Sequence, residues 1–417
     1  MSKKNLLFAP VAFNLAETTR MLEIAKGVRN HEQASQIFSI QFISDGGQFE
    51  HLIEAAGFPL KKMLPQLTEE KIEFISKVDK GEKFAPAFST AELIERIENE
   101  IAYLKVLKPT AVITGSYVSI PVSCQIQQVP LVWVIQSTWL PQFFTNGAGM
   151  TDTIKFRPLK KVADVLVYLF INFWIRYGFL HTLNKAARHF GVQTYRSIFD
   201  YWRGDVTMVA EPAEFTGIEL PPNYYYTGPL IAREAFPIPE EIKQIPRDKP
   251  LIYFAMGSSG TPEIVAKITE SFAGKPYRVI APVKSHLDKV PNVKIPPNVL
   301  VTDWLPAQQV NKLVDLSVIH GGIGTVMTAA YAGRPVVGVG MQPEQDANIA
   351  GLVRKGFAIR VPKSRDPSAK VQKAIEQLLN DSQARQKAEA FARVMTRWDG
   401  PCLAADLLVE KFGNVPQ

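Results

Sequence analysis

Short apolar runs alternate with amphipathic stretches along most of the chain. In the first half, apolar runs at 6–13, 36–44, 111–114 and 131–135 are separated by stretches with helical periodicity, and a further run lies at 206–210. In the second half, the runs lie at 251–257, 277–282, 299–303, 316–320 and 335–339. Strands that alternate with helices predict parallel sheets with helices on both faces. The pattern therefore predicts an α/β protein with two doubly wound, Rossmann-like domains.

A proline-rich segment marks the boundary between the two sets of runs. Residues 231–250 hold four prolines among charged residues, which is typical of a linker, and 417 residues suffice for two domains with their own cores. We expect a first domain over 1–235, a second over 236–385 and a helical tail over 386–417. Hydrophobic and charged contents of 46% and 21% are those of an ordinary globular protein.

The charge and the cysteines narrow the class of protein. The net charge of +7 occurs without a run of five basic residues and without a nucleic-acid-binding motif, so an anionic small substrate explains it better than nucleic acid. Cys124 and Cys402 cannot form a disulfide framework, which favours a reducing compartment. The first apolar run is too short for a signal peptide. We therefore expect a cytoplasmic protein, with a peripheral membrane contact as an open question.

That question comes from the helical region 160–200, which contains an uninterrupted apolar run at Val165–Ile171. The run is much shorter than the roughly 20 residues that span a bilayer, and Asp164 and Asn172 bound it. One interpretation is an amphipathic helix packed on the first domain. The other is a helix at a membrane surface, helped by nearby basic residues. Those residues are Lys155, Arg157, Lys160 and Lys161.

The most specific pattern begins where the apolar run 316–320 ends. His320 leads into a glycine-rich turn that includes Gly322 and Gly324, and we expect a helix to begin at Thr325. Glycines let a ligand approach the backbone closely, and the free N–H groups and dipole of a helix start favour a phosphate. His320 adds a hydrogen-bond donor beside it. The alternative is a tight structural turn without a ligand.

Two polar residues strengthen the ligand interpretation. Glu344 and Gln345 follow the next apolar run, where they can hydrogen-bond a polyhydroxylated ligand. Together with the phosphate turn, they predict a site for a sugar attached to a diphosphate.

This segment resembles the donor signature of the family 1 glycosyltransferases, which include the plant secondary-product and bacterial macrolide types. The likeness spans the layout of the whole chain but is specific only from about residue 250 onward. It implies the GT-B fold, in which two Rossmann-like domains face a central cleft, with a C-terminal helix that crosses back to the first domain. The matching residues are Trp304, His320, Gly322, Thr325, Gly333, Pro335, Glu344 and Gln345.

The resemblance also implies roles for other residues of the second domain. Trp304 would stack on the nucleobase, the backbone of Leu305 would pair with it, and Gly257 and Ser258 would contact the diphosphate opposite His320. The competing role for Trp304 is a place in the core. The family's ribose-binding glutamate is replaced by Thr328, so the choice between UDP and dTDP stays open.

The first domain departs from the family at the catalytic base. The usual histidine falls on Glu17, and its partner aspartate falls near Gly115 and Ser116. Glu17 could act as the base if burial raised its pKa, or it could simply favour the dipole of a helix start. Asn14 is a candidate for orienting the substrate. The candidate acceptor-lining residues are Ser116, Trp139 and Phe143.

The sequence shows no Asp-x-Asp motif and no metal-ligand spacing, so we expect no metal and no cofactor beyond the donor substrate. We expect an inverting transferase that moves a sugar, glucose from UDP-glucose in the first instance, to a hydroxyl of a hydrophobic small molecule or lipid. The alternatives are a nucleotide-sugar epimerase of the same fold and a non-catalytic nucleotide-sugar-binding partner protein.

Overall fold

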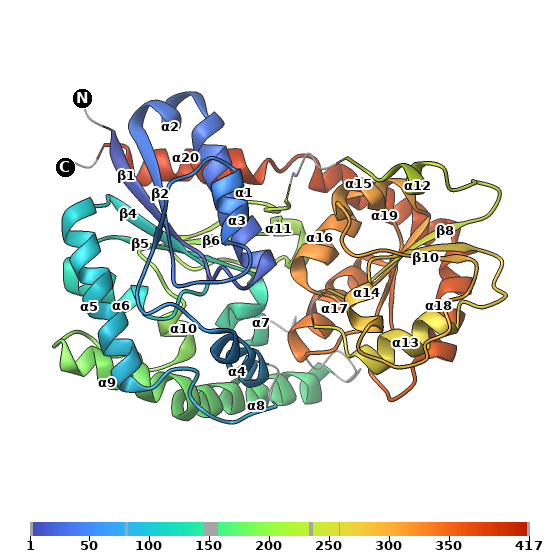
Figure 1. Cartoon of the computed structure of the whole chain (residues 1–417), viewed down its shortest axis with the longest axis horizontal. Coiled ribbons are helices and arrows are strands. Elements are labelled where there is room, and N and C mark those ends of the chain that lie inside the picture. Colours follow the sequence, from blue (N-terminus) through green and yellow to red (C-terminus); the bar gives the residue numbers. More distant parts are fainter. Residues whose placement is uncertain (1–2, 80–81, 146–156, 233–236, 258, 415–417) are drawn as a thin grey trace.

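The computed structural model of the chain describes residues 3–79, 82–145, 157–232, 237–257 and 259–414. It contains two parallel sheets in two bodies that lie side by side, and the C-terminal helices pass from the second body back to the first (Figure 1). The two sheets share one winding pattern.

The first sheet has seven strands in the order β3-β2-β1-β4-β5-β6-β7, and all its pairings are parallel. The chain winds outward from β1 in one direction, then returns to the other side of β1 with β4. Ala9, the last residue of β1, pairs with Thr114, the last residue of β4. The strands are β1 (Lys4–Ala9), β2 (Phe38–Ser44), β3 (Leu60–Lys62), β4 (Ala111–Thr114), β5 (Leu131–Ile135), β6 (Val206–Val209) and β7 (Tyr224–Tyr226).

The second sheet repeats this winding with six parallel strands in the order β10-β9-β8-β11-β12-β13. Ile319, at the end of β11, pairs with Ala255, at the end of β8. In such sheets the carboxyl ends of the strands flanking the reversal form the usual ligand site. The strands are β8 (Leu251–Ala255), β9 (Arg278–Ala281), β10 (Val299–Val301), β11 (Leu316–Ile319), β12 (Val336–Gly338) and β13 (Ala358–Arg360).

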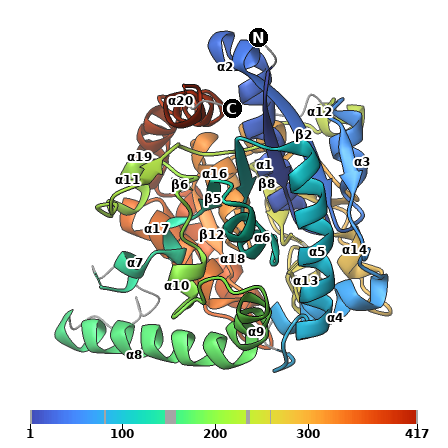
Figure 2. The ribbon, with the colours of Figure 1, turned by 90° about the vertical axis from the view of Figure 1, so that its left-hand side faces the viewer.

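Helices cover both faces of the first sheet. The longest is α8, which adjoins the π-helix η2 and then α9 along one edge of the molecule (Figure 2). The helices are α1 (Leu15–Asn30), α2 (Glu32–Ile37), α3 (Glu50–Ala55), α4 (Glu69–Asp79), α5 (Thr90–Leu107), α6 (Ile120–Gln127), η1 (Ser137–Trp139), α7 (Pro141–Thr145), α8 (Arg157–Ile175), η2 (Arg176–Leu180), α9 (His181–His189), α10 (Ile198–Tyr201) and α11 (Ala213–Thr216).

The helices of the second half surround its sheet, except for the last one. Helix α20 lies against α1 of the first half, where Gly27 is so close to the backbone of Pro401 that no Cβ would fit (Figure 1). The helices are α12 (Glu240–Lys243), α13 (Pro262–Glu270), α14 (Lys284–Leu287), α15 (Ala307–Leu313), α16 (Ile323–Tyr331), α17 (Pro343–Lys355), α18 (Ser368–Leu379), α19 (Ser382–Met395) and α20 (Gly400–Phe412).

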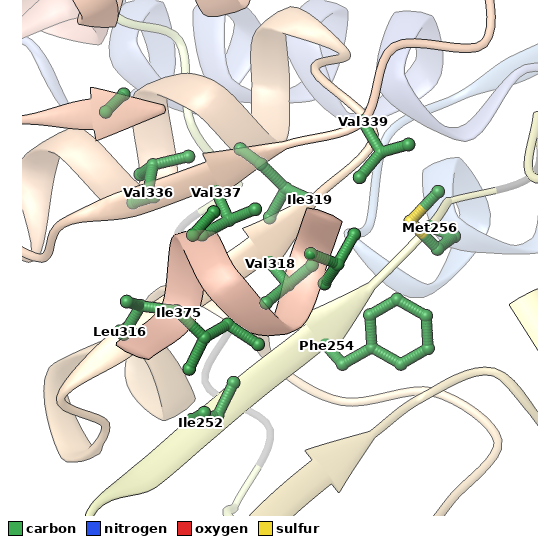
Figure 3. Packing of buried hydrophobic residues seen from close by; sticks show 14 of the residues in the cluster. Ile252, Phe254, Met256, Leu316, Val318, Ile319, Val336, Val337, Val339 and Ile375 are labelled. Atoms are coloured by element: carbon green, nitrogen blue, oxygen red, sulfur yellow. The ribbon is translucent and has the colours of Figure 1, made fainter. Parts of the chain in front are cut away.

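Each sheet is the centre of a separate apolar core. In the second half, side chains of β8 and β11, such as Phe254 and Val318, pack under Ile375 of α18 (Figure 3). In the first half, one cluster lies on each face of the sheet, and α20 contributes Leu408 and Phe412 to one of them. Burial of these apolar side chains is the main term that stabilises both halves.

The predicted strands occur close to their expected positions, with several differences at their ends. The run 36–44 loses its first two residues to α2, and the run 6–13 is a strand only as far as Ala9. Strands β3 and β13 were not predicted, because each has only three residues and neither lies in one of the longer apolar runs. The linker contains the short helix α12.

Candidate functional site

The candidate phosphate turn, residues 321–324, lies where β11 ends, beside the end of β8. Gly321 has a φ of +90°, and Gly322 is the N-cap of α16, with no side chain hydrogen-bonded to the helix start. Helix α16 begins at Ile323, two residues before the expected start at Thr325, with Gly322 at the N-cap position. Thr325 donates its hydroxyl to the Gly322 carbonyl at 2.8 Å. The uncapped helix start is suited to an anion.

Two glycines make room for the His320 ring. A Cβ on Gly257, whose φ is +54°, would lie 2.5 Å from His320 Cε1, and one on Gly322 would lie 2.6 Å from Nε2. Burial lowers the pKa of His320 to about 4. The imidazole is therefore neutral at neutral pH, and it can give a phosphate a hydrogen bond but not a full positive charge.

Gln345 connects the loops that follow β8 and β12. Its side-chain oxygen accepts the Met341 N–H at 2.9 Å, and its amide nitrogen donates to Ser259 Oγ at 2.8 Å. The buried side chain therefore fixes the relative position of two loops beside the phosphate turn. Ser258, the predicted diphosphate contact, lies outside the described residues.

Glu344 reaches across to the first half of the chain. Its Oε1 accepts a hydrogen bond of 2.5 Å from Gln136, which follows β5, and burial raises the pKa of Glu344. Asn348, one turn further along α17, donates to the same oxygen at 3.4 Å. A sugar hydroxyl that binds this carboxylate has to replace or join Gln136.

Trp304 and Leu305 follow β10 in sequence and differ in exposure. Trp304 is 49% exposed, so it is a surface side chain and not part of the core. The Leu305 side chain is buried beside Tyr253 and Val310. Only the backbone of Leu305 can therefore take the role that the resemblance implies. Thr328, at the position of the ribose-binding glutamate, is buried and donates its hydroxyl to the Gly324 carbonyl at 2.6 Å.

On the side of the first sheet, Glu17 lies at the start of α1, between the ends of β1 and β4. Its Oε1 accepts the Gly115 N–H at 2.9 Å, and Ser116 hydrogen-bonds the same carboxyl group. A Cβ on Gly115 would collide with both carboxylate oxygens. Burial raises the pKa of Glu17 despite the opposing charge of Arg20. The structure thus brings together the two segments that stand at the family's histidine and aspartate positions.

Asn14 is the N-cap of α1. Its side-chain oxygen accepts the N–H groups of Ala16 at 3.0 Å and Glu17 at 3.3 Å. This capping role accounts for the oxygen, and it holds the first turn of α1, which carries Glu17.

The predicted acceptor-lining aromatics lie near the end of β5. Trp139 stacks on Trp202 with their ring centroids 4.6 Å apart, and it is partly exposed. Phe143 is fully buried and packs against Phe144, so its side chain has no surface that an acceptor could contact in this conformation. Periodicity could not distinguish these two aromatic side chains, because only the packing of α7 decides which of them is covered.

The sequence patterns did not predict two charged residues of this site, Glu211 and Arg20. Glu211, after β6, accepts the Ser137 N–H at 3.2 Å, and burial raises its pKa to about 7. The charge of Arg20 acts on Glu17, Glu211 and Glu344 alike. An acid directly after a parallel strand was the available signal for Glu211.

One group of candidate metal ligands occurs among the described residues, and it lies away from this site. His31, Cys402 and Asp406 sit between α1 and α20. The Nδ1 of His31 accepts the Ala34 N–H at 3.1 Å, so Nε2 carries the proton and donates to Asp406 at 2.9 Å. A metal at Nε2 would disrupt this arrangement.

Similarity to known proteins covers both halves of the chain. Residues 279–409 match the family model of the erythromycin biosynthesis protein CIII-like C-terminal domain. Over 404 residues the chain is 26% identical to a PGL/p-HBAD biosynthesis glycosyltransferase of Mycobacterium tuberculosis, covering 94% of this chain and 88% of that protein.

Two solved structures show the same fold over nearly their whole length. The calicheamicin glycosyltransferase CalG4 aligns with a TM-score of 0.66 at 18% identity, covering 100% of both chains. The glycosyltransferase VinC, solved in complex with dTDP, aligns with a TM-score of 0.66 at 15% identity, covering 97% of this chain and 98% of that one. The predicted pair of doubly wound domains is therefore confirmed as the GT-B fold.

Proposed function

The chain is a glycosyltransferase of family 1, and from this premise we propose that it transfers a hexose with inversion, without a metal, from a nucleoside diphosphate to a hydroxyl of a hydrophobic acceptor. The observation that carries this proposal is the Glu17 carboxyl group. It is buried between the ends of β1 and β4, with a raised pKa. Such a group can accept a proton from an alcohol.

The donor would bind on the loops after β8, β11 and β12. The diphosphate meets the uncapped start of α16 and the N–H of His320, and Gly257 and Gly322 keep both accessible. The helix dipole and the N–H groups then stabilise the charge that develops on the leaving group. This arrangement supplies a role that a divalent cation has in other transferases.

The sugar would be transferred in a single displacement step, with Glu17 as the general base. The acceptor oxygen attacks the anomeric carbon as its proton passes to Glu17, and the bond to the nucleoside diphosphate breaks with its electron pair on the departing phosphate oxygen. The Gly115 N–H and Ser116 hold the carboxylate in position. Attack from the face opposite the leaving group inverts the configuration.

Glucose from UDP-glucose is our first choice of donor. This choice rests on Gln345, which matches the family's donor signature, and on the Glu344 carboxylate, which can accept hydrogen bonds from sugar hydroxyls. The dTDP bound to VinC makes a dTDP-sugar the second choice. Thr328, which is short and bonded within its own helix, provides no carboxylate for the ribose and so leaves both bases open.

The deciding experiment is acceptor-dependent nucleotide release in excess EDTA. UDP-glucose and dTDP-glucose are each offered with a mixed panel of phenolic and lipid hydroxyl acceptors, and the product is analysed for anomeric configuration. Release of nucleotide that requires an acceptor and survives EDTA supports the proposal. Activity that EDTA abolishes contradicts the metal-independent mechanism.

Two alternatives predict other outcomes. An epimerase would convert the donor sugar without any acceptor. A non-catalytic partner protein would bind nucleotide tightly and release none with any acceptor, and its support is the absence of the usual histidine and aspartate. Absence of UDP and dTDP binding would contradict the donor site itself.

A further inference from the structure

The outer face of α8 is apolar, and several of its side chains are exposed among the residues that the structure describes. Leu166, Leu169 and Phe173 are 60%, 55% and 62% exposed, which is unusual for three large apolar side chains on one helix. They belong to a stripe with helical spacing along the whole helix. Its members are Leu159, Val162, Val165, Leu166, Leu169, Phe170 and Phe173.

The opposite face of α8 is the one that holds the helix to the protein. Tyr168 stacks on Phe199, with their centroids 5.1 Å apart, and Val167 and Ile175 pack on the same core. Asp164 is fully buried there. Helix α8 is thus apolar on both sides, a pattern that ordinarily belongs to a helix enclosed by protein or lipid.

The stripe continues into η2 and α9 as a line of cations. After Phe173, exposed positions follow at Arg176, Lys185 and Arg188, while the opposite side of α9 is buried against the first domain. Residues 176–189 contain three lysines and arginines and no acid, and the one acid of 157–175 is the buried Asp164. One continuous helical segment therefore presents an apolar half and a cationic half to the outside.

The position of this segment lets a flat surface reach it. Figures 1 and 2 both show α8 along the lower edge of the molecule, clear of the second sheet. Among the described residues, no helix is long and apolar enough to cross a membrane. Helices of this composition lie in the plane of the interface, with apolar side chains at the acyl boundary and cations at anionic headgroups.

We propose that the α8–η2–α9 segment docks the protein on the surface of an anionic lipid bilayer, with the apolar stripe inserted and the α9 cations at the headgroups. The basic side chains of the segment favour an anionic bilayer over a second copy of this chain, because two copies would place like charges against each other. The proposal is independent of the sugar that the protein transfers.

Co-sedimentation with vesicles tests the proposal. Vesicles of equal parts phosphatidylglycerol and phosphatidylcholine should bind the full chain, and the double variant Leu166→Glu, Leu169→Glu should lower the partition coefficient at least tenfold. The matched control is Ile295→Glu, which replaces a 52% exposed side chain in the other half of the protein and should bind like the wild type. Thermal melting verifies that each variant is folded.

A second pair of variants tests the electrostatic half without changing the apolar stripe. Lys185→Glu with Arg188→Glu should weaken binding to the anionic vesicles severalfold, and added salt should have the same effect on the wild type. Hydrogen exchange of α8 in the wild type should slow when vesicles are added.

Three outcomes would overturn the proposal. The wild type could stay in the supernatant with anionic vesicles, or the Leu166 and Leu169 variant could bind them as well as the wild type does. The third is a lipid-free dimer that the same variant converts to a monomer, which would assign the stripe to a second copy of the chain.

Discussion

Replacement of Glu17 by glutamine tests the proposed mechanism most directly. The substitution keeps the size of the side chain, and the remaining carbonyl oxygen can still accept the Gly115 N–H that now lies 2.9 Å from Oε1. It removes the capacity to take a proton. The new amide group is also a donor facing Ser116, which hydrogen-bonds the native carboxyl.

The size of the effect follows from the role of a general base. Such a base contributes about 10²- to 10⁴-fold to the rate, or about 3–5 kcal/mol of transition-state stabilisation. We expect kcat to fall by this factor while the Kd of UDP is unchanged, since the donor loops belong to the other domain. Burial disfavours the ionised form of Glu17, so its removal should not lower, and should even raise, the free energy of unfolding at neutral pH.

The assay is initial-rate nucleotide release as a function of pH. In the wild type, kcat/KM should fall tenfold per unit as the pH drops below the raised pKa of Glu17, because the protonated carboxyl cannot act as a base. The variant should lose this dependence. Glu23→Gln is the matched control, since Glu23 lies on the same helix and is paired with Lys26 at 2.9 Å.

The reasoning fails if Glu17→Gln retains wild-type turnover, or if it and Glu23→Gln lose activity equally. A third variant tests the remaining candidate for the general base, Glu211. Glu211 is also buried, with a pKa near 7, so activity that survives Glu17→Gln and is lost in Glu211→Gln would identify Glu211 as the base.

Three further predictions concern the donor site and stability. Gly257→Ala should weaken UDP binding at least tenfold in calorimetry, because the new Cβ would lie 2.5 Å from the His320 ring. The control is Gly57→Ala, which should bind UDP normally, because Gly57 has a similar positive φ but no atom within 4 Å of the position of a Cβ. The His320 imidazole should stay neutral between about pH 8 and pH 5 in an NMR titration of the free protein, and a midpoint near 6.5 would contradict its lowered pKa. Burial raises the pKa of Glu100 from 4.5 to about 7, so the folded state holds a proton that the unfolded state loses. The melting temperature should therefore fall as pH rises from about 4.5 to about 7, and Glu100→Gln should remove part of that slope; identical slopes would refute the assignment.

Local features of the sequence were enough to predict the glycine-rich turn that follows β11. The turn from His320 to Gly324 lies within five consecutive residues. Gly321 is required by its positive φ, and Gly322 by its close contact with the His320 ring. Strands such as β4 and β5 were predicted to the residue, because continuous apolar runs bounded by polar segments leave little choice. The ends of helices and strands were predicted less well than their centres. Several neighbouring residues can serve as an N-cap, as at Gly322, where α16 begins two residues before the expected start.

The sequence by itself determined the two α/β domains and the glycine-rich turn after His320, because these depend on side-chain periodicity and on glycines close together in the chain. The resemblance placed Glu17 and Gly115 at the positions of a partnered pair, but their contact across almost a hundred residues is a property of the tertiary structure, since it requires β4 to lie beside β1. The same holds for the contact of Gln136 with Glu344 and for the exposure of Leu166 on α8. A pattern along the chain gives the faces of each element, but the packing of elements decides which faces are covered and which remain available to a ligand or a membrane.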